Sequence, residues 1–317
     1  MIIPRATYRL QFNKDFTFRD AIALVDYFAA LGVSHLYASP FLMARPGSTH
    51  GYDITDHNLL NPEIGTEEDL AALVAALRER GMGLILDFVP NHMGIGSDNP
   101  WWLEVLELGE SAPVASFFDI DWDAGNGKVL LPILGDHYGT VLVNGEIRVR
   151  FDPVEGTISA WYWDHRFPIA PADYPELLRN AAVPDEAADE HQRIVDELGR
   201  LALESRRRWR PGIYDETRQL QRDLAAIAEV PTVAAALAEA VESVNGEAGR
   251  RTTWHGLHQL LERQAYRLAY WLVAADEINY RRFFNINDLA GLRVELPELF
   301  ERMHRLVFRL IDEGKLD

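Results

Sequence analysis

Apolar residues in the first 93 positions of the chain follow two kinds of spacing, one typical of β-strands and one typical of helices, which take turns along the sequence. Residues 5–12 alternate apolar and polar side chains and are rich in strand-forming types, which predicts a first β-strand. Helical spacing follows, with Thr17 placed as an N-cap, Asp20 three positions later and a buried stripe of Ala21, Leu24, Val25, Phe28 and Leu31. An apolar run over 33–39 then predicts a second strand that ends at Pro40.

The same order of elements returns after a loop of about 25 residues, a length that usually signals function in a compact domain. Thr66 and Asp69 open a second predicted helix, which Gly81 closes. A third strand over 83–89 ends at Pro90. Two successive strand–helix–strand passes predict parallel strands joined by right-handed crossovers, and so an α/β fold.

The pattern changes after Met93. Residues 97–170 contain short strand-like pieces, and Asn144-Gly145 predicts a hairpin between strands over 140–143 and 146–151. Residues 186–280 have helical spacing instead, including Leu257, Leu260, Leu261, Leu268 and Leu272. A last helix begins at Pro297 and ends at Gly314, with a stripe of Phe300, Met303, Val307, Leu310 and Ile311.

These patterns predict the first three βα units of a (β/α)8 barrel with a large mixed β/helical insertion after the third strand. The expected domains are 1–93 for the barrel strands, 94–285 for the insertion and 286–317 for a barrel helix. Within the insertion, 94–170 is expected to be β-rich and 171–285 helical. Closing a barrel takes about eight strands, so three cannot do so alone.

Composition narrows the class of function. The 317 residues carry a net charge of −18, which disfavours nucleic acid or an anionic membrane as a partner. There are no cysteines, so disulfides and thiol nucleophiles are excluded. The sequence has neither a signal-peptide pattern nor a long apolar run, and a cytoplasmic protein is expected.

Polar residues gather at two predicted strand ends. Asp87, Asn91 and His92 follow the third strand. Asp87 could cap a backbone group while His92 is only a loop residue; alternatively, His92 donates to a ligand hydroxyl and Asp87 and Asn91 brace the loop. The pattern alone leaves the two interpretations about even.

The loop after the second strand contains the other cluster, His50-Gly51-Tyr52-Asp53. Its carboxylate could simply satisfy local amides, as in an Asx-turn. Alternatively, Tyr52 is an aromatic platform for a sugar ring beside the Asp53 carboxylate, because a sugar has an apolar face and a polar rim.

Other kinds of chemistry lack their residues. The chain has no glycine-rich phosphate loop, no H-E-x-x-H and no G-x-S-x-G, and its histidines lack metal-ligand spacing, so no metal or cofactor is expected. Glycoside chemistry needs two facing carboxylates. Asp53 and Asp87 are the strand-end candidates, and neither has an evident acid/base partner.

Several of these motifs resemble one known family. Asp87-Phe88-Val89-Pro90-Asn91-His92 and His50-Gly51-Tyr52-Asp53 resemble signatures of the α-amylase family of glycoside hydrolases, family thirteen. Further stretches resemble its maltooligosyltrehalose synthase group; they are 5–12, 35–40, 44–50, 98–102 and 276–284. The chain departs from that group's usual residues at Leu272 and Asn285.

The resemblance implies a retaining intramolecular transglucosylase that turns the reducing-end α-1,4 linkage of a maltooligosaccharide into an α,α-1,1 linkage. It implies that Tyr52, Asp53, His50 and His92 bind substrate and that Asp87 and Asn91 shape the site. The family's nucleophilic Asp lies in a G-x-R-x-D-H stretch on strand four and its acid/base Glu on strand five, and neither motif occurs here.

We therefore expect an N-terminal portion of such an enzyme that is inactive alone and could be completed by a C-terminal chain. The alternatives are another α-amylase-family hydrolase and a non-catalytic carbohydrate-binding protein.

Overall fold

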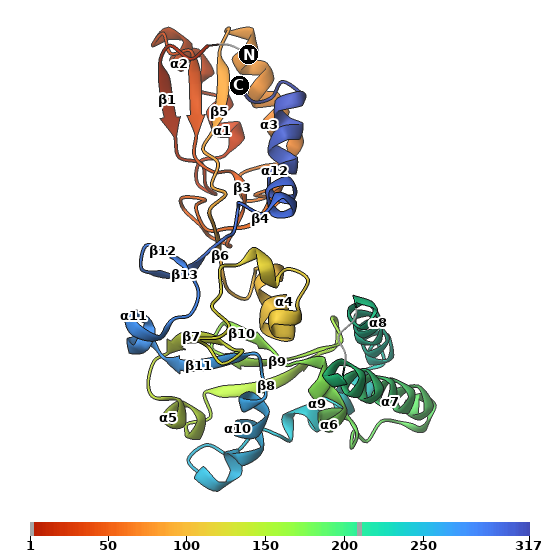
Figure 1. Cartoon of the computed structure of the whole chain (residues 1–317). Helices are drawn as coiled ribbons and strands as arrows, with labels where there is room; N and C mark the ends of the chain where they lie inside the picture. Colours follow the sequence, from red (N-terminus) through yellow and green to blue (C-terminus); the bar gives the residue numbers. More distant parts are fainter. Residues whose placement is uncertain (1–2, 208–210) are drawn as a thin grey trace. The chain divides into compact units, whose positions relative to one another are not determined.

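The computed structural model describes residues 3–207 and 211–317, and the chain divides into two compact units (Figure 1). Unit 1 comprises Met1–Pro100, Ser116–Asp119 and Tyr280–Asp317, and unit 2 comprises Trp101–Ala115 and Ile120–Asn279. Residues 94–100 and 280–285, which the sequence pattern places in the insertion, lie in unit 1 because strand β13 pairs with strand β6.

Unit 1 contains most of the predicted barrel elements. Its strands are β1 (Thr7–Leu10), β2 (His35–Ala38), β3 (Leu42–Ala44), β4 (Ile54–Leu60), β5 (Gly83–Leu86), β6 (His92–Gly94), β12 (Arg282–Phe283) and β13 (Ile286–Gly291). Its helices are α1 (Phe18–Ile22), α2 (Val25–Ala30), α3 (Glu67–Glu79) and α12 (Pro297–Asp312).

Unit 2 contains short sheets and several longer helices. Its strands are β7 (Val129–Leu134), β8 (Ile147–Asp152), β9 (Thr157–Tyr162), β10 (His165–Pro168) and β11 (Tyr266–Tyr270). Its helices are α4 (Pro100–Leu108), whose first residue still belongs to unit 1, α5 (Tyr138–Val143), α6 (Tyr174–Leu178), α7 (Asp185–Arg207), α8 (Pro211–Ala228), α9 (Pro231–Glu242), α10 (His255–Glu262) and α11 (Ala274–Glu277). Short 3-10 turns connect several of them, including η4 (Arg251–Trp254) and η5 (Trp271–Val273).

The three predicted strands form one parallel sheet in the order β1-β2-β5. One face packs against the helices and contributes Leu10, Leu36 and Leu84 to the apolar core, together with residues of α1, α3 and α12. The opposite face presents Arg9 and Tyr37, which are neighbours in the β1–β2 register. The polar face of the sheet is therefore the one that can reach a ligand.

The helix starts predicted from the sequence are confirmed. Thr17 and Thr66 each form a capping box, with Asp20 and Asp69 respectively, and Pro297 lies in the first turn of α12. The first helix is nevertheless two short helices, because the chain turns at Ala23 and Leu24. Leu24 and the later Leu31 are consequently exposed, and Phe18 occupies the core in their place.

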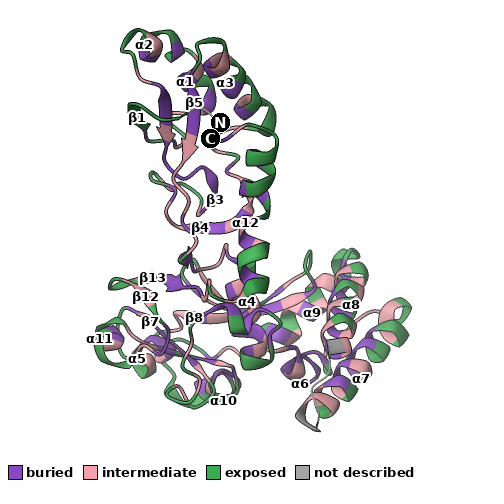
Figure 2. Ribbon diagram, turned by 45° about the horizontal axis from the view of Figure 1, so that its top comes forward, coloured by how far each residue is buried: buried purple, intermediate pink, exposed green. Residues whose placement is uncertain are grey.

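The buried side of α12 also differs from the predicted stripe. Leu299 and Leu306 join Met303, Val307 and Leu310 in the buried set. Phe300 and Ile311 are exposed, together with Phe308. Figure 2 shows that α12 has both exposed and buried parts. Two apolar residues can occupy adjacent turns of a helix without sharing one face, and only packing decides which face is buried.

Unit 2 corrects the hairpin predicted at Asn144-Gly145. Residues 138–143 form helix α5, Asn144 is its C-cap, and Gly145 adopts φ +76° immediately after it. An Asn-Gly pair favours a left-handed residue, which serves the end of a helix as well as a hairpin. The antiparallel hairpin lies one segment later, between β8 and β9.

The predicted helical face through Leu268 and Leu272 is also wrong. Residues 266–270 form β11, which pairs in parallel with β7. Leu268 is buried in that sheet and Leu272 is exposed beyond it. Within the described residues, no helix is long and apolar enough to span a bilayer.

Candidate active site

The polar residues of unit 1 meet where its parallel strands end. The register aligns Leu10, Ala38 and Leu86 as the last paired residues of β1, β2 and β5. Asp87 follows directly, and its backbone N–H donates to the Ala38 carbonyl. The carboxyl edge of a parallel sheet is where α/β folds usually bind their ligands.

Three side chains form the centre of this cluster. The Tyr52 hydroxyl donates to Asp87 Oδ2 at 2.5 Å and accepts from Arg9 Nη2 at 2.9 Å. Arg9 Nη1 lies 3.4 Å from the same carboxylate oxygen. The guanidinium also lies 5.1 Å from the centre of the Tyr37 ring. The cluster thus joins β1, β2, β5 and the loop before β4 through one carboxylate.

The two tyrosines of this cluster are held in the protonated form. Partial burial raises the pKa of Tyr52, and the hydrogen bond to Asp87 raises it further. Burial and the Asp87 charge raise the pKa of Tyr37 in the same way. Both hydroxyl groups therefore keep a proton to donate, and an Asp87 oxygen already accepts hydrogen bonds from Tyr52 and Arg9.

The Tyr52 loop is held by its own short-range contacts. Asp53 accepts a 2.5 Å hydrogen bond from the Ser48 hydroxyl, and its backbone oxygen accepts from Arg45. His50 is exposed, with its Nδ1 accepting from the Tyr52 backbone N–H at 3.0 Å and lying 3.8 Å from Asp53. Asp53 therefore shapes the loop from inside, whereas His50 faces solvent.

Gly51 is required by this loop for two separate reasons. Its φ is +75°, and a Cβ added there would lie 2.2 Å from the Pro40 carbonyl oxygen. A side chain would thus force either the loop or the segment after β2, at Pro40, to move.

We expect Gly51→Ala to destabilise unit 1 by about 2–4 kcal/mol, because a backbone clash adds to the cost of a left-handed residue. Gly32→Ala is the matched control, since Gly32 has φ +79° with no atom within 4 Å of a built Cβ. The control should cost only about 1–2 kcal/mol. Urea unfolding of both variants checks this, and equal losses would contradict the close approach to Pro40.

His92 is buried, and both of its ring nitrogens contact protein groups and not solvent. Its ring is 2% exposed and stacks on Phe283, with 4.1 Å between ring centres. Nε2 lies 3.1 Å from the Tyr52 backbone oxygen and Nδ1 lies 3.0 Å from the Asn91 side chain. Burial lowers the pKa of His92, so the neutral ring has one N–H to donate.

Both ring nitrogens face oxygen acceptors. Nε2 lies against the Tyr52 carbonyl and Nδ1 against the Asn91 amide oxygen, so the neutral ring donates its one proton to one of the two. His92 and Asn91 thereby hold the backbone that carries Tyr52. The predicted bond from His92 to a sugar hydroxyl stays a prediction, and in this arrangement it requires the ring or the Tyr52 loop to move.

Sequence reasoning did not assign Arg9 and Tyr37 to the site. Both residues lie in stretches that the sequence pattern marks as strands, where alternation places them on one face of the sheet. A charged residue, Arg9, three positions before Phe12 in the alternating pattern of the first predicted strand was the available signal. Only the pairing of β1 with β2, and of β2 with β5, shows that Arg9 reaches Asp87.

The residues of this cluster can bind and orient a ligand. The carboxylate of the cluster is engaged by Tyr52 and Arg9, and Asp53 is engaged by Ser48. Among the described residues, no group of three His, Asp or Glu side chains could hold a metal ion. The protonated tyrosines, the guanidinium and the half-buried Tyr52 ring suit a neutral ligand with many hydroxyl groups.

Comparison with known proteins agrees with this description. Residues 17–138 match the α-amylase catalytic domain family. That match covers the second and third parallel strands and the Tyr52 loop. The fold of unit 1 is therefore related to the TIM barrel, and the resemblance to the α-amylase family is confirmed.

The similarity extends to one group of enzymes over nearly the whole chain. A curated protein of Mycobacterium tuberculosis, named provisionally as a maltooligosyl trehalose synthase, is 36% identical over 98% of this chain and 30% of its own length. The solved maltooligosyltrehalose synthase of Arthrobacter ramosus is 32% identical with a TM-score of 0.66, over 99% of this chain and 30% of that one. A further crystal structure of a maltooligosyl trehalose synthase is 28% identical with the same TM-score, over 99% and 31%.

The resemblance to maltooligosyltrehalose synthases, read from the motifs, is therefore confirmed. The chain spans about 30% of the length of these relatives.

Proposed function

We propose that this chain is the N-terminal part of an intramolecular transglucosylase that forms a terminal trehalose unit from a maltooligosaccharide. The carrying observation is the Tyr52–Asp87–Arg9 cluster at the carboxyl edge of a parallel sheet. The similarity to maltooligosyltrehalose synthases over 98% of the chain supports the same reading. In this proposal Tyr52 stacks on the sugar at the bond that is cleaved. Asp87 and Arg9 hold the Tyr52 ring in place through its hydroxyl group.

The mechanism assigned to the complete protein is retaining. A nucleophilic Asp would form a glucosyl-enzyme and a Glu would act as acid and then as base. We place both outside these 317 residues, because neither the G-x-R-x-D-H stretch nor the strand-five motif occurs in them. The released glucose must be turned and must attack through its anomeric hydroxyl while water is excluded. Aromatic contacts like those of Tyr52 suit that task, because they hold a ring face without directing its hydroxyl groups.

Unit 1 has the surfaces that such a completed protein would cover. In the described part of the chain, β1 and β5 are the outer strands of the parallel sheet, each with one neighbour. On α12, Phe300 and Phe308 are exposed on either side of His304, whose ring stacks with both. The Leu84 backbone of β5 already bonds to Asp317 on that side, whereas β1 keeps an open edge. An open strand edge and an exposed aromatic row favour contact with further chain. We propose that three βα units of a (β/α)8 barrel are present here and that a complementary C-terminal chain supplies the rest.

The reading frame beyond codon 317 offers an inexpensive discrimination. A G-x-R-x-D-H stretch shortly after Asp317 supports the enzyme. A genuine stop codon there supports a binding protein or a split chain instead.

The experiment is a titration of the 317-residue chain with maltopentaose, followed by an assay for loss of the reducing end. We expect binding without conversion. Tyr52→Ala should weaken binding roughly tenfold or more, since it removes both the ring and the hydroxyl, and Tyr52→Phe should weaken it less, since the ring remains. Tyr27→Ala removes an exposed tyrosine of α2 and should bind like the parent chain.

Isothermal titration calorimetry measures the binding, and circular dichroism confirms that each variant is folded. A non-reducing product from the chain alone would contradict the assignment of both catalytic carboxylates to another segment. Unchanged binding by Tyr52→Ala would remove Tyr52 from the proposed site.

A further inference from the structure

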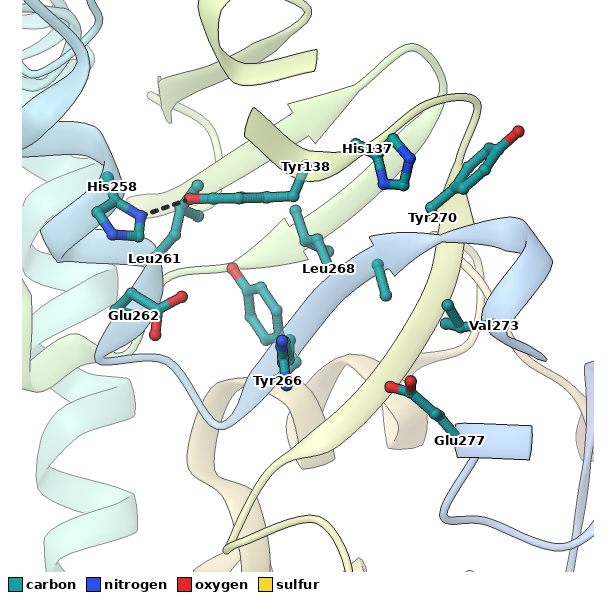
Figure 3. Close-up of a pocket in the computed structure, with 12 residues that line it drawn as sticks. His137, Tyr138, His258, Leu261, Glu262, Tyr266, Leu268, Tyr270, Val273 and Glu277 are labelled. Carbon is teal, nitrogen blue, oxygen red and sulfur yellow. Dashed lines mark hydrogen bonds between the residues drawn. The ribbon is translucent and has the colours of Figure 1, made fainter. Parts of the chain in front are cut away.

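Unit 2 contains a cavity of about 430 Å³ that has no part in the candidate active site (Figure 3). It lies against helices α5 and α10, strand β11 and helix α11. This volume is within the range of pockets that hold small ligands. The candidate active site described above uses residues of unit 1 alone, so the two sites belong to different compact units.

The floor of the cavity is apolar and its wall is aromatic. Leu261 and Leu268 are buried at the floor, and Tyr266 is fully buried beside them. Tyr138 crosses the cavity wall in Figure 3, and its hydroxyl lies 3.1 Å from His258 Nδ1. These surfaces offer a ring-shaped ligand an apolar face to pack against.

A second aromatic pair closes the other end. The rings of His137 and Tyr270 lie 5.1 Å apart between their centres. Tyr270 is the last residue of β11 and is half-buried, so part of its ring remains available to a ligand. Two tyrosines at opposite ends of one wall can contact successive rings of a short oligomer.

The polar groups of the cavity include two carboxylates, one guanidinium and the Tyr138 hydroxyl, which is bonded to His258. Glu262 and Glu277 are exposed carboxylates at different ends of the floor (Figure 3), and Arg267 is exposed between them in the sequence. Burial, together with the Glu262 charge, raises the pKa of Tyr138, so its hydroxyl stays protonated. Two carboxylates against one guanidinium, in a chain with net charge −18, disfavour an anionic ligand.

From these contacts we propose that the cavity is a second binding site for a short neutral α-glucan, separate from the candidate active site. Tyr138 and Tyr270 pack against the sugar rings, and Glu262 and Glu277 accept hydrogen bonds from hydroxyl groups. The choice of a glucan rests on the proposed function, whereas the cavity and its lining do not. A site of this kind keeps maltooligosaccharide bound to the protein, which raises its effective concentration.

The test is ligand-observed saturation-transfer NMR of the whole 317-residue chain with maltotriose. Tyr270→Ala and Glu277→Gln are each expected to weaken the binding of maltotriose in the cavity roughly three- to tenfold. Tyr138→Phe, which removes only the hydroxyl, should reduce binding less than Tyr270→Ala does. Tyr27→Ala removes the same kind of side chain from an exposed position of α2. It should leave maltotriose binding unchanged both at the Tyr52 cluster and in the cavity.

The experiment distinguishes failure of the cavity proposal from failure of the proposed function. If Tyr52→Ala removes all maltotriose binding and Tyr270→Ala none, the cavity is not a glucan site, while the proposed function stands. If Tyr270→Ala weakens binding and Tyr52→Ala does not, the cavity proposal stands and the placement of substrate at Tyr52 fails. Saturation transfer to choline but not to maltotriose would overturn the proposal in favour of a cation bound by the aromatic rings and carboxylates.

Discussion

Glu107→Ala is expected to destabilise unit 2 by about 3 kcal/mol, because it leaves a partly buried cation without its buried anion. Glu107 is 5% exposed on α4, where Arg218 Nη2 donates to one carboxylate oxygen at 2.5 Å. The side-chain amide of Gln221 donates to the other oxygen at 2.9 Å. Truncation would remove both acceptor oxygens. The Arg218 guanidinium, which is 26% exposed, would keep its hydrogen bond to Gln221 Oε1 but lose the Glu107 carboxylate.

Urea unfolding monitored by tryptophan fluorescence measures this loss. Glu190→Ala is the control, because Glu190 also binds an arginine, Arg193, but is 46% exposed. That surface pair should contribute less than about 1 kcal/mol. The double variant Glu107→Met/Arg218→Met should recover much of the stability, since apolar residues can replace a buried ion pair. Equal losses from Glu107→Ala and Glu190→Ala would show that the α4–α8 contact does not depend on this pair.

The stability of unit 1 is expected to fall by about 3 kcal/mol between pH 6.5 and pH 4 because of His57. His57 is 1% exposed in β4, and burial lowers its pKa from 6.5 to about 4. Its Nε2 donates to the Val89 carbonyl at 3.0 Å, and Nδ1 is buried with no hydrogen-bond partner.

The direction of this pH effect follows from the two protonation states. Above pH 6.5 His57 is neutral in both the folded and the unfolded chain, so its contribution is constant. Between pH 6.5 and pH 4 the unfolded chain binds a proton that the folded chain does not, and stability falls as the pH falls. Below pH 4 both forms are protonated and the loss is complete. Burial also lowers the pKa of His92, which adds an effect of the same sign.

Comparing the pH dependence of unfolding in the parent chain and in His57→Gln separates the contribution of His57 from that of the other titratable groups. The free energy of unfolding of His57→Gln should depend less on pH between 6.5 and 4 than that of the parent chain. His50→Gln is the control in the same unit, since the His50 side chain is 52% exposed. Parallel pH profiles for the parent and His57→Gln would show that the buried ring titrates as it does in water.

Part of the candidate site was predictable because its residues follow strand ends in the sequence. Asp87 and Tyr52 were selected from their positions after the third and second strands, and the structure brings them within hydrogen-bond distance. The partner of Asp87 on β1 was not predicted. Arg9 lies 78 residues away along the chain, and only the β1-β2-β5 order places it beside that carboxylate.

The errors in the predicted fold share a physical origin. Asn144-Gly145 and the run through Leu268 are local signals that two different structures can satisfy. The packing of α5 against β11, and the pairing of β11 with β7, decided between them. Side-chain packing also determined that Leu299 rather than Phe300 is buried on α12.

The sequence by itself determined the parallel strands, the two capping boxes and the candidate ligand-binding loop, because each depends on residues that are close in the chain. Only the tertiary structure decided the burial of His92, the Arg9–Asp87–Tyr52 contacts and the cavity beside Tyr138. Those features depend on which distant segments lie together, and local residue patterns do not contain that information.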